Sequence, residues 1–170
     1  AVITENTMGI EALKKGKSPK TLANWEALKS SINKDLDPGV LYGTVIVTNQ
    51  DGFDVLDSAT DSMGRPILEP NPTNPTQRKF KGYTVEVFSN ALMPTAENKA
   101  PVFYGNLAEA AKFVDLDGQV AFATSSEAGF MSNTTIARLI EFIDVVQCDS
   151  SDKCYCYGEL STLTAKKLEE

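Results

Sequence analysis

Apolar residues in the first quarter of the chain predict a helix over residues 18–36. They recur at spacings of three and four, which places them on one helical face, and they are Leu22, Trp25, Leu28, Ile32 and Leu36. Ser18 followed by Pro19 is typical of a helix start, because Ser caps and Pro fits the first turn. Asp37-Pro38-Gly39 then ends the helix.

Short runs of β-branched and aromatic residues predict three strands, over residues 42–48, 83–88 and 101–105. After the first strand, Asn49 can cap a short helix that carries Phe53 and Leu56. A turn at residues 61–66 leads into residues 66–76, which hold four prolines. We expect this segment to be a loop without regular structure. Residues 63–81 are expected to form a mobile loop.

The second half of the chain is rich in turn signals. Residues 106–109 resemble a capping box and predict a short helix through Lys112. Residues 113–123 indicate a hairpin that turns at Asp117-Gly118. Residues 134–148 fit a helical stripe and a long strand equally well, so periodicity leaves both open.

Composition and charge argue against a membrane-spanning protein, a nucleic-acid-binding protein and an enzyme that relies on histidine. The chain has 170 residues, is 42% hydrophobic and carries 16 basic against 23 acidic residues, for a net charge of −7. It holds no apolar run of the roughly 18 residues that a membrane span needs, and its few basic clusters do not suit a grip on nucleic acid. Histidine is absent, which excludes Ser-His-Asp and Cys-His nucleophiles and histidine-bound metals.

The three cysteines lie close together at Cys148, Cys154 and Cys156. Their spacing supplies three thiols, one ligand short of a zinc site, unless Asp149 or Asp152 is the fourth. A disulfide across the turn between Cys148 and Cys154 is an alternative. The simplest interpretation is reduced thiols on a strand pair in a reducing cytoplasm.

Other motifs fail on their spacing. Gly16-Lys17-Ser18 lacks the first glycine of a phosphate-binding loop, and the Asp115–Gly118 segment lacks the rest of a calcium-binding loop. No pair of carboxylates stands out as an acid–base couple. From the residues alone we therefore expect an α+β domain that is not an enzyme, with no catalytic residue, no metal site and no cofactor.

Taken in order, six segments resemble the C-terminal part of a tailed-phage major capsid protein with the HK97 fold. The first is the helix that starts near residue 20, and the others are residues 42–53, 56–68, 81–94, 102–122 and 130–146. Each segment is weak alone, but their order and spacing are specific. The resemblance covers residues 20–163 and implies that residues 134–148 form a long strand.

The resemblance implies an HK97-like α+β architecture: an axial domain whose central β-sheet is flanked by helices, plus part of the peripheral β-hairpin. Residues 20–112 and 148–163 would form the axial domain and residues 113–147 the hairpin. Residues 1–19 would be an N-terminal remnant, and residues 164–170 a frayed tail. The upstream arm, extended loop and spine helix of such proteins have no counterpart here, so we expect a truncated subunit.

The implied function is structural: a subunit of a phage or prophage icosahedral capsid that self-assembles into pentamers and hexamers. Its partners would be other capsid subunits, with no membrane, no sequence-specific nucleic acid and only indirect contact with packaged DNA. It would be assembled in the bacterial host cytoplasm and located in the virion. Without the upstream elements we expect monomers or small oligomers. The alternatives are an encapsulin-like nanocompartment shell and a small cysteine-based metal-binding module.

Some members of this family cross-link neighbouring subunits through an Asn before the long strand. Asn133 stands at that position here. The family's catalytic Glu corresponds to Ile140, and Glu141, one residue on, would face the opposite side of a strand. We therefore do not expect a covalent cross-link at Asn133.

Overall fold

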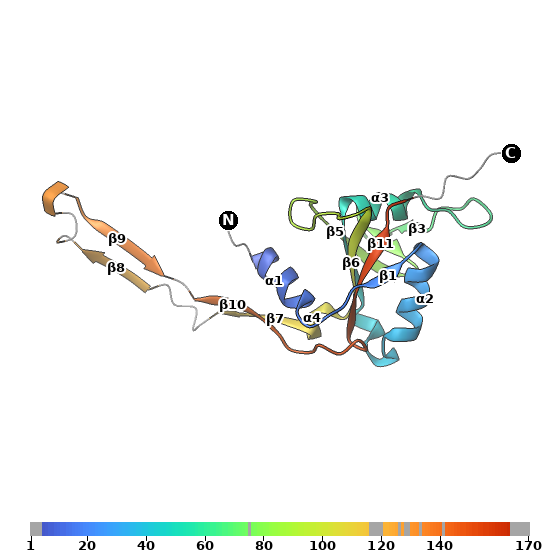
Figure 1. The fold of residues 1–170 in the computed structure, drawn as a ribbon, viewed down its shortest axis with the longest axis horizontal. Coiled ribbons are helices and arrows are strands. Elements are labelled where there is room, and N and C mark those ends of the chain that lie inside the picture. The colour runs from blue at the N-terminus through green and yellow to red at the C-terminus, as the bar shows by residue number, and fades with distance from the viewer. Residues whose placement is uncertain are drawn as a thin grey trace.

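Helices pack on both faces of a seven-stranded sheet, and a long two-stranded arm leaves one end of this body (Figure 1). The computed structural model describes residues 5–74, 76–115, 121–125, 127, 130–132, 134–140 and 142–163. The body brings together segments from both ends of the described chain, because β1 (Lys20–Leu22) pairs in parallel with β11 (Tyr155–Ser161).

The sheet has the strand order β1-β11-β6-β2-β5-β4-β3. Its other strands are β2 (Val45–Asn49), β3 (Leu68–Pro70), β4 (Arg78–Phe80), β5 (Tyr83–Phe88) and β6 (Lys99–Gly105). β2 runs parallel to β5, and β6 is antiparallel to both β2 and β11. The central strand β6 is buried along most of its length, as expected for a strand that is covered on both faces.

Two apolar cores lie on opposite faces of the sheet. On one face, α2 (Trp25–Asp35) and α3 (Gln50–Ser58) bury Leu28, Ile32 and Leu56 against Val102 and Tyr104 of β6. On the other face, α1 (Glu5–Lys14) packs Ile10 against Phe103. Phe103 lies between Val102 and Tyr104 in β6, so its side chain points to the opposite face of the sheet. A short helix, α4 (Leu107–Ala110), connects β6 to the arm.

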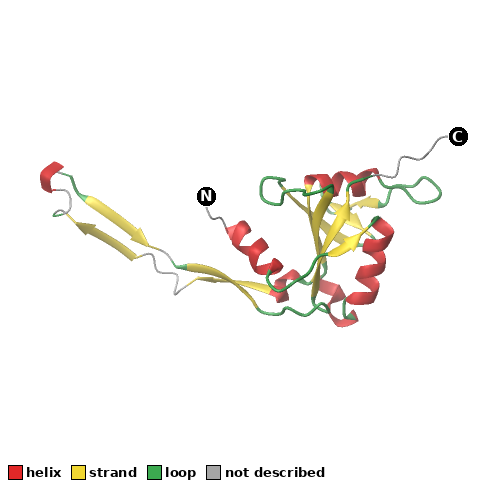
Figure 2. Cartoon of the chain, viewed as in Figure 1, coloured by secondary structure: helices red, strands yellow, loops and turns green. Residues whose placement is uncertain are grey.

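The arm is a two-stranded ribbon in two sections (Figure 2). The section next to the body pairs β7 (Ala111–Asp115) with β10 (Ile143–Gln147), and the distal section pairs β8 (Ala121–Ser125) with β9 (Ile136–Ile140). A one-turn 3-10 helix lies at Phe130–Ser132 near the arm tip, and a longer 3-10 helix lies at Pro38–Gly43 in the body. Among the described helices, none has the length and apolar character needed to cross a membrane.

Several sequence predictions are confirmed. Asn49 caps α3, because its side-chain oxygen accepts a hydrogen bond from the Gly52 amide at 2.9 Å. β5 has the predicted bounds, and β6 starts two residues before the predicted strand. The described part of residues 134–148 holds two strands, β9 and β10, rather than a helix, although the family resemblance implied one long strand.

Other predictions are wrong because long-range pairing overrides local signals. The helix predicted from Ser18 begins at Trp25, where Asn24 caps it, and the residues before it form β1. The strand predicted from Tyr42 starts at Val45 after the 3-10 turn. Residues 66–76 are not wholly irregular, since β3 pairs with β4 within the predicted mobile loop. No element was predicted where α1 lies.

The predicted hairpin over residues 113–123 is also wrong. β7 pairs with β10 and β8 pairs with β9, so both outgoing sections pair with strands that return from the tip. The short helix ends at Ala110 rather than Lys112, because Ala111 already pairs with Gln147. The predicted turn at Asp117-Gly118 and the predicted tail lie outside the described residues.

Candidate assembly interface

The arm presents apolar side chains to solvent along its length. Phe122 and Leu139 lie opposite each other on β8 and β9, with 65% and 67% of their surfaces exposed. Between its base and its tip, the arm has six other large apolar residues that are at least a third exposed, and these are Phe113, Val114, Ile136, Phe142, Ile143 and Val146. Because side chains alternate along a strand, these residues lie on both faces of the ribbon. Exposed apolar residues of this kind are typical of a segment that contacts another protein.

Over the described residues, the ribbon has no second layer that could bury these side chains. A two-stranded ribbon alone is marginally stable in water, and the distal section pairs only with itself among the described strands. Near the body, α1 contacts β10 and β7 and leaves Val145 half-buried. Beyond that contact, the exposed apolar residues have no cover within the described chain. We define the arm's apolar surface as the eight residues named above.

The base of the arm is tied to the body by backbone hydrogen bonds. The carbonyl of Ala110, just before β7, accepts from the amides of Cys148 and Asp149 at 2.8 and 3.3 Å, just after β10. The Asn106 amide donates to the carbonyl of Cys154 at 3.0 Å. The outgoing and returning chains are therefore held together where they leave the sheet.

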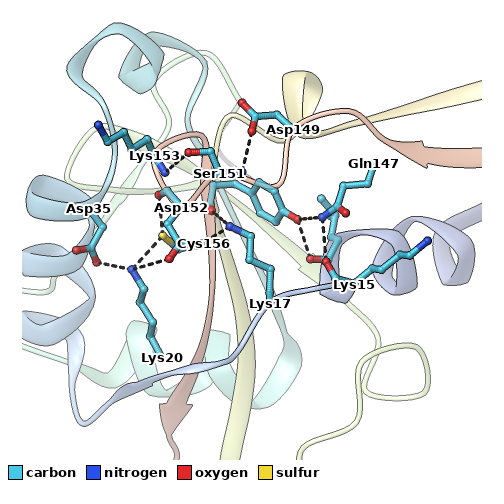
Figure 3. Close-up of polar contacts among 12 residues, drawn as sticks. Lys15, Lys17, Lys20, Asp35, Gln147, Asp149, Ser151, Asp152, Lys153 and Cys156 are labelled. Carbon is cyan, nitrogen blue, oxygen red and sulfur yellow. Dashed lines mark hydrogen bonds and ion pairs between the residues drawn. The ribbon is translucent and has the colours of Figure 1, made fainter.

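Side chains reinforce this base around Tyr155 (Figure 3). The Tyr155 side chain is fully buried. Its hydroxyl donates to the carbonyl of Leu13 at 3.0 Å and accepts from Nε2 of Gln147 at 2.6 Å. The ammonium of Lys17 lies 4.3 Å from the Tyr155 ring centre, which is a favourable cation–π distance. One buried ring thus contacts α1, the following linker and the last residue of β10.

A second polar cluster lies nearby around Lys20 (Figure 3). Its ammonium is 3.0 Å from Asp35 and 3.4 Å from the sulfur of Cys156. Burial lowers the pKa of Lys20, but hydrogen bonds to Asp35 and Cys156 outweigh it and raise the pKa overall. Burial raises the pKa of the Cys156 thiol against the opposing effect of Lys20. The cluster joins β1, α2 and β11 and so ties three elements of the body together.

The residues singled out from the sequence fall in different places. Asn133 and Glu141 lie outside the described residues, and Ile140 ends β9. Cys148 is exposed while Cys154 and Cys156 are buried, and all three are free thiols, so the predicted alternative of a disulfide is wrong. Across the described ranges, no three His, Cys, Asp or Glu side chains are gathered as a metal site would require.

The arm's apolar surface was not identified from the sequence as an interface. Its residues do not follow one strand period, because Phe113 and Val114 are adjacent and Ile136, Leu139, Ile143 and Val146 recur at spacings of three and four. The signal that could have revealed it is the combination of these apolar residues with pairing between only two strands. That pairing joins residues far apart in the chain and is visible only in the structure.

The sequence matches the phage capsid family over residues 3–151. Among solved structures, the capsid of a native GTA particle is similar, with 12% identity and a TM-score of 0.62, over 88% of this chain and 55% of that chain. The capsid of an empty GTA particle has 11% identity and a TM-score of 0.58, over 81% of this chain and 44% of that one. No curated protein matches the sequence.

These likenesses show an HK97-like capsid fold, as the sequence predicted. The chain spans about half the length of the solved capsid proteins that it matches. The family match extends over most of the chain, through the body and the arm. This protein therefore belongs to the phage capsid family.

Proposed function

We propose that this chain is part of a structural subunit of a phage or prophage icosahedral capsid, which acts by self-association into pentamers and hexamers. The observation that carries the proposal is the exposed Phe122–Leu139 pair, which no element of the described chain covers. Membership of the capsid family supports a second copy as the partner. Closed shells are built from repeated contacts between identical subunits, so function resides in surfaces rather than in a catalytic pocket.

In this proposal residues 20–112 and 148–163 form the axial domain, which makes up most of the body. The arm is the peripheral hairpin, residues 113–147. The strands of the arm support this division, since β7 leaves the body at Ala111 and β10 returns at Gln147. Residues 1–19 precede the axial domain, and residues 164–170 follow it.

The partners in this proposal are other capsid subunits, assembled in the bacterial host cytoplasm and retained in the virion. The net charge of −7 supports only indirect contact with packaged DNA, because phosphate binding relies on clustered basic residues. Subunits are held by non-covalent contacts, because Ile140 stands where a cross-linking member of the family has its catalytic Glu. Burial of apolar arm residues supplies the driving force.

Sedimentation velocity over a range of concentrations tests this role of the arm. The unmodified chain is expected to self-associate, and the double variant Phe122→Ser/Leu139→Ser to remain monomeric at the same concentrations. Tyr42→Ser serves as the matched control, because Tyr42 is 86% exposed on the body and distant in sequence from the arm. A chain that is monomeric throughout, or a double variant that associates as strongly as the control, would contradict the role of the arm as the driving force for association.

A further inference from the structure

The base of the arm contains one lysine whose charge is almost completely enclosed. The Lys17 side chain is only 4% exposed, and its ammonium lies 2.5 Å from a carboxylate oxygen of Asp152. It also donates to the backbone carbonyl of Tyr155 at 3.0 Å. An enclosed charge is costly unless it is paired and hydrogen-bonded. Moving the Lys17 ammonium away from these partners would therefore cost free energy, and the side chain is held in one position.

Through Tyr155, this lysine reaches the returning strand of the arm. Its ammonium covers the face of the Tyr155 ring, and the hydroxyl of the same ring accepts from Gln147, the last residue of β10. Gln147 also donates to the backbone carbonyl of Lys15 at 3.1 Å. Contacts through Tyr155 therefore connect three parts of the molecule: the linker after α1, which contains Lys17, the strand β11, which contains Tyr155, and the arm, which ends at Gln147.

Lys17 also occupies part of the free edge of β11. β11 pairs with β6 along its whole length, but β1 pairs only with Gly158, Glu159 and Leu160 on its other side. The carbonyl of Tyr155, before that paired segment, receives the Lys17 ammonium instead of a strand. The lysine thus replaces strand pairing at the place where the arm joins the sheet.

We infer that Lys17 is a positioning residue for assembly: acting through Tyr155 and Gln147, it sets the direction in which the arm leaves the body. This inference rests on the proposed function, because a fixed direction matters only if the arm meets a neighbouring subunit. A two-stranded ribbon has little intrinsic resistance to bending at its base. The contacts at that base therefore determine where the arm's apolar surface is presented.

The neighbouring Lys20 provides a matched control. It also lies near Asp152, at 4.0 Å, and forms an ion pair with Asp35 at 3.0 Å. Its described contacts are with Asp35, Asp152 and Cys156 and include neither Tyr155 nor Gln147. Lys20→Met therefore removes the same charge from the same region without touching the base of the arm. Asp152 is 61% exposed, so water can solvate its carboxylate in either variant.

The direction of the arm can be measured by electron–electron double resonance between two spin labels on the full chain. Glu26→Cys on α2 and Asp115→Cys on β7 provide exposed sites, in a Cys148→Ser background that removes the exposed native thiol. A chain without the two introduced cysteines reports any labelling of Cys154 and Cys156. Circular dichroism checks that each variant is folded.

We expect Lys17→Met to broaden the distance distribution by about twofold or more, as a locally released segment would. Lys20→Met should leave it unchanged, and Lys17→Arg, which keeps the charge and donors, should restore a narrow distribution. If Lys17→Met does not fold, Gln147→Leu replaces it, with the same broadening expected. Unchanged distributions in Lys17→Met and Gln147→Leu, or equal broadening in Lys20→Met, would overturn the inference.

Sedimentation of the same variants separates this inference from the proposed function. Broadening by Lys17→Met in a chain that never self-associates would support the role of Lys17 and contradict the role of the arm in assembly. Self-association of the unmodified chain together with an unchanged distance distribution in Lys17→Met would support the role of the arm in assembly and contradict the role of Lys17.

Discussion

The side chain of Asn49 both caps α3 and donates a hydrogen bond to the backbone carbonyl of Met93. Its amide nitrogen donates to the Met93 carbonyl at 2.8 Å, while its side-chain oxygen accepts from the Gly52 amide. Asn49 and Met93 are both fully buried. This residue therefore joins the start of α3 to the loop that follows β5, and both attachments are lost together if it is removed.

Asn49→Ala should destabilise the fold by about 2–4 kcal/mol, because it removes a cap and leaves a buried carbonyl unpaired. Asn24 provides the matched control. It caps α2 through the Ala27 amide at 2.9 Å but is exposed, so Asn24→Ala should cost only about 1 kcal/mol. Urea unfolding of both variants measures the difference. Equal losses would show that the contact with Met93 adds nothing.

Elements set by local chemistry could be predicted from the sequence, and those set by distant partners could not. The cap at Asn49 depends on a few neighbouring residues, so the start of α3 was correct. Ser18-Pro19 is an equally good local signal, yet the residues that follow form β1 and pair with residues 158–160, far along the chain. The partner of a strand is not encoded in its own periodicity.

The candidate interface follows the same physical rule. Phe122 and Leu139 are apolar, and apolar character alone does not say whether the layer that covers a residue belongs to the same chain. The contacts of Lys17 with Tyr155 bring together residues that are distant in sequence. Only the fold places them side by side, so no motif search could find them.

Gly105 is a second point where close approach constrains the sequence. Its φ is +134°, and an added Cβ would lie 2.5 Å from the carbonyl oxygen of Cys154. Gly105→Ala should therefore destabilise the fold by more than about 2 kcal/mol, since neither strand can move away without breaking its pairing.

Gly9 is the matched control for that substitution. It lies within α1, and an added Cβ would meet nothing within 4 Å. Gly9→Ala should stabilise the protein by about 0.5–1 kcal/mol, because alanine restricts the unfolded chain and favours helix. Thermal unfolding of both variants tests the pair. A Gly105→Ala variant as stable as Gly9→Ala would show that β6 and β11 are not packed this closely.

Asp35 should make stability depend on acid pH. Burial raises its pKa, but hydrogen bonds from Ser31 and Lys20 outweigh burial and hold the pKa below its ordinary value. A carboxyl with a lowered folded-state pKa stabilises the fold above its unfolded pKa of about 3.9, and this contribution is lost as pH falls through the folded value. Urea midpoints measured from about pH 6 down to about pH 2 should fall less steeply in Asp35→Asn.

The comparison for Asp35 is Asp54→Asn, a matched loss of one negative charge at an exposed position of α3. Its pH profile should parallel that of the unmodified chain. Parallel profiles for Asp35→Asn and the unmodified chain would mean that the contacts with Ser31 and Lys20 do not favour the charged carboxylate.

The three thiols should differ sharply in reactivity. Cys148 is exposed, whereas Cys154 and Cys156 are buried, and burial raises the pKa of both buried thiols. The thiolate is the reactive form, so the two buried thiols are slowed by access and by protonation together. Ellman's reagent at neutral pH should therefore modify one thiol rapidly in the folded chain and all three in denaturant.

Cys148→Ser should abolish the rapid phase without changing the urea midpoint, because the substitution leaves the core intact. Cys154→Ala and Cys156→Ala should each lower stability by about 1–2 kcal/mol, since each removes a small buried hydrophobic group. A rapid phase that persists in Cys148→Ser would show that the N-terminal half of β11 opens in solution, which the enclosure of Tyr155 by Lys17 should prevent.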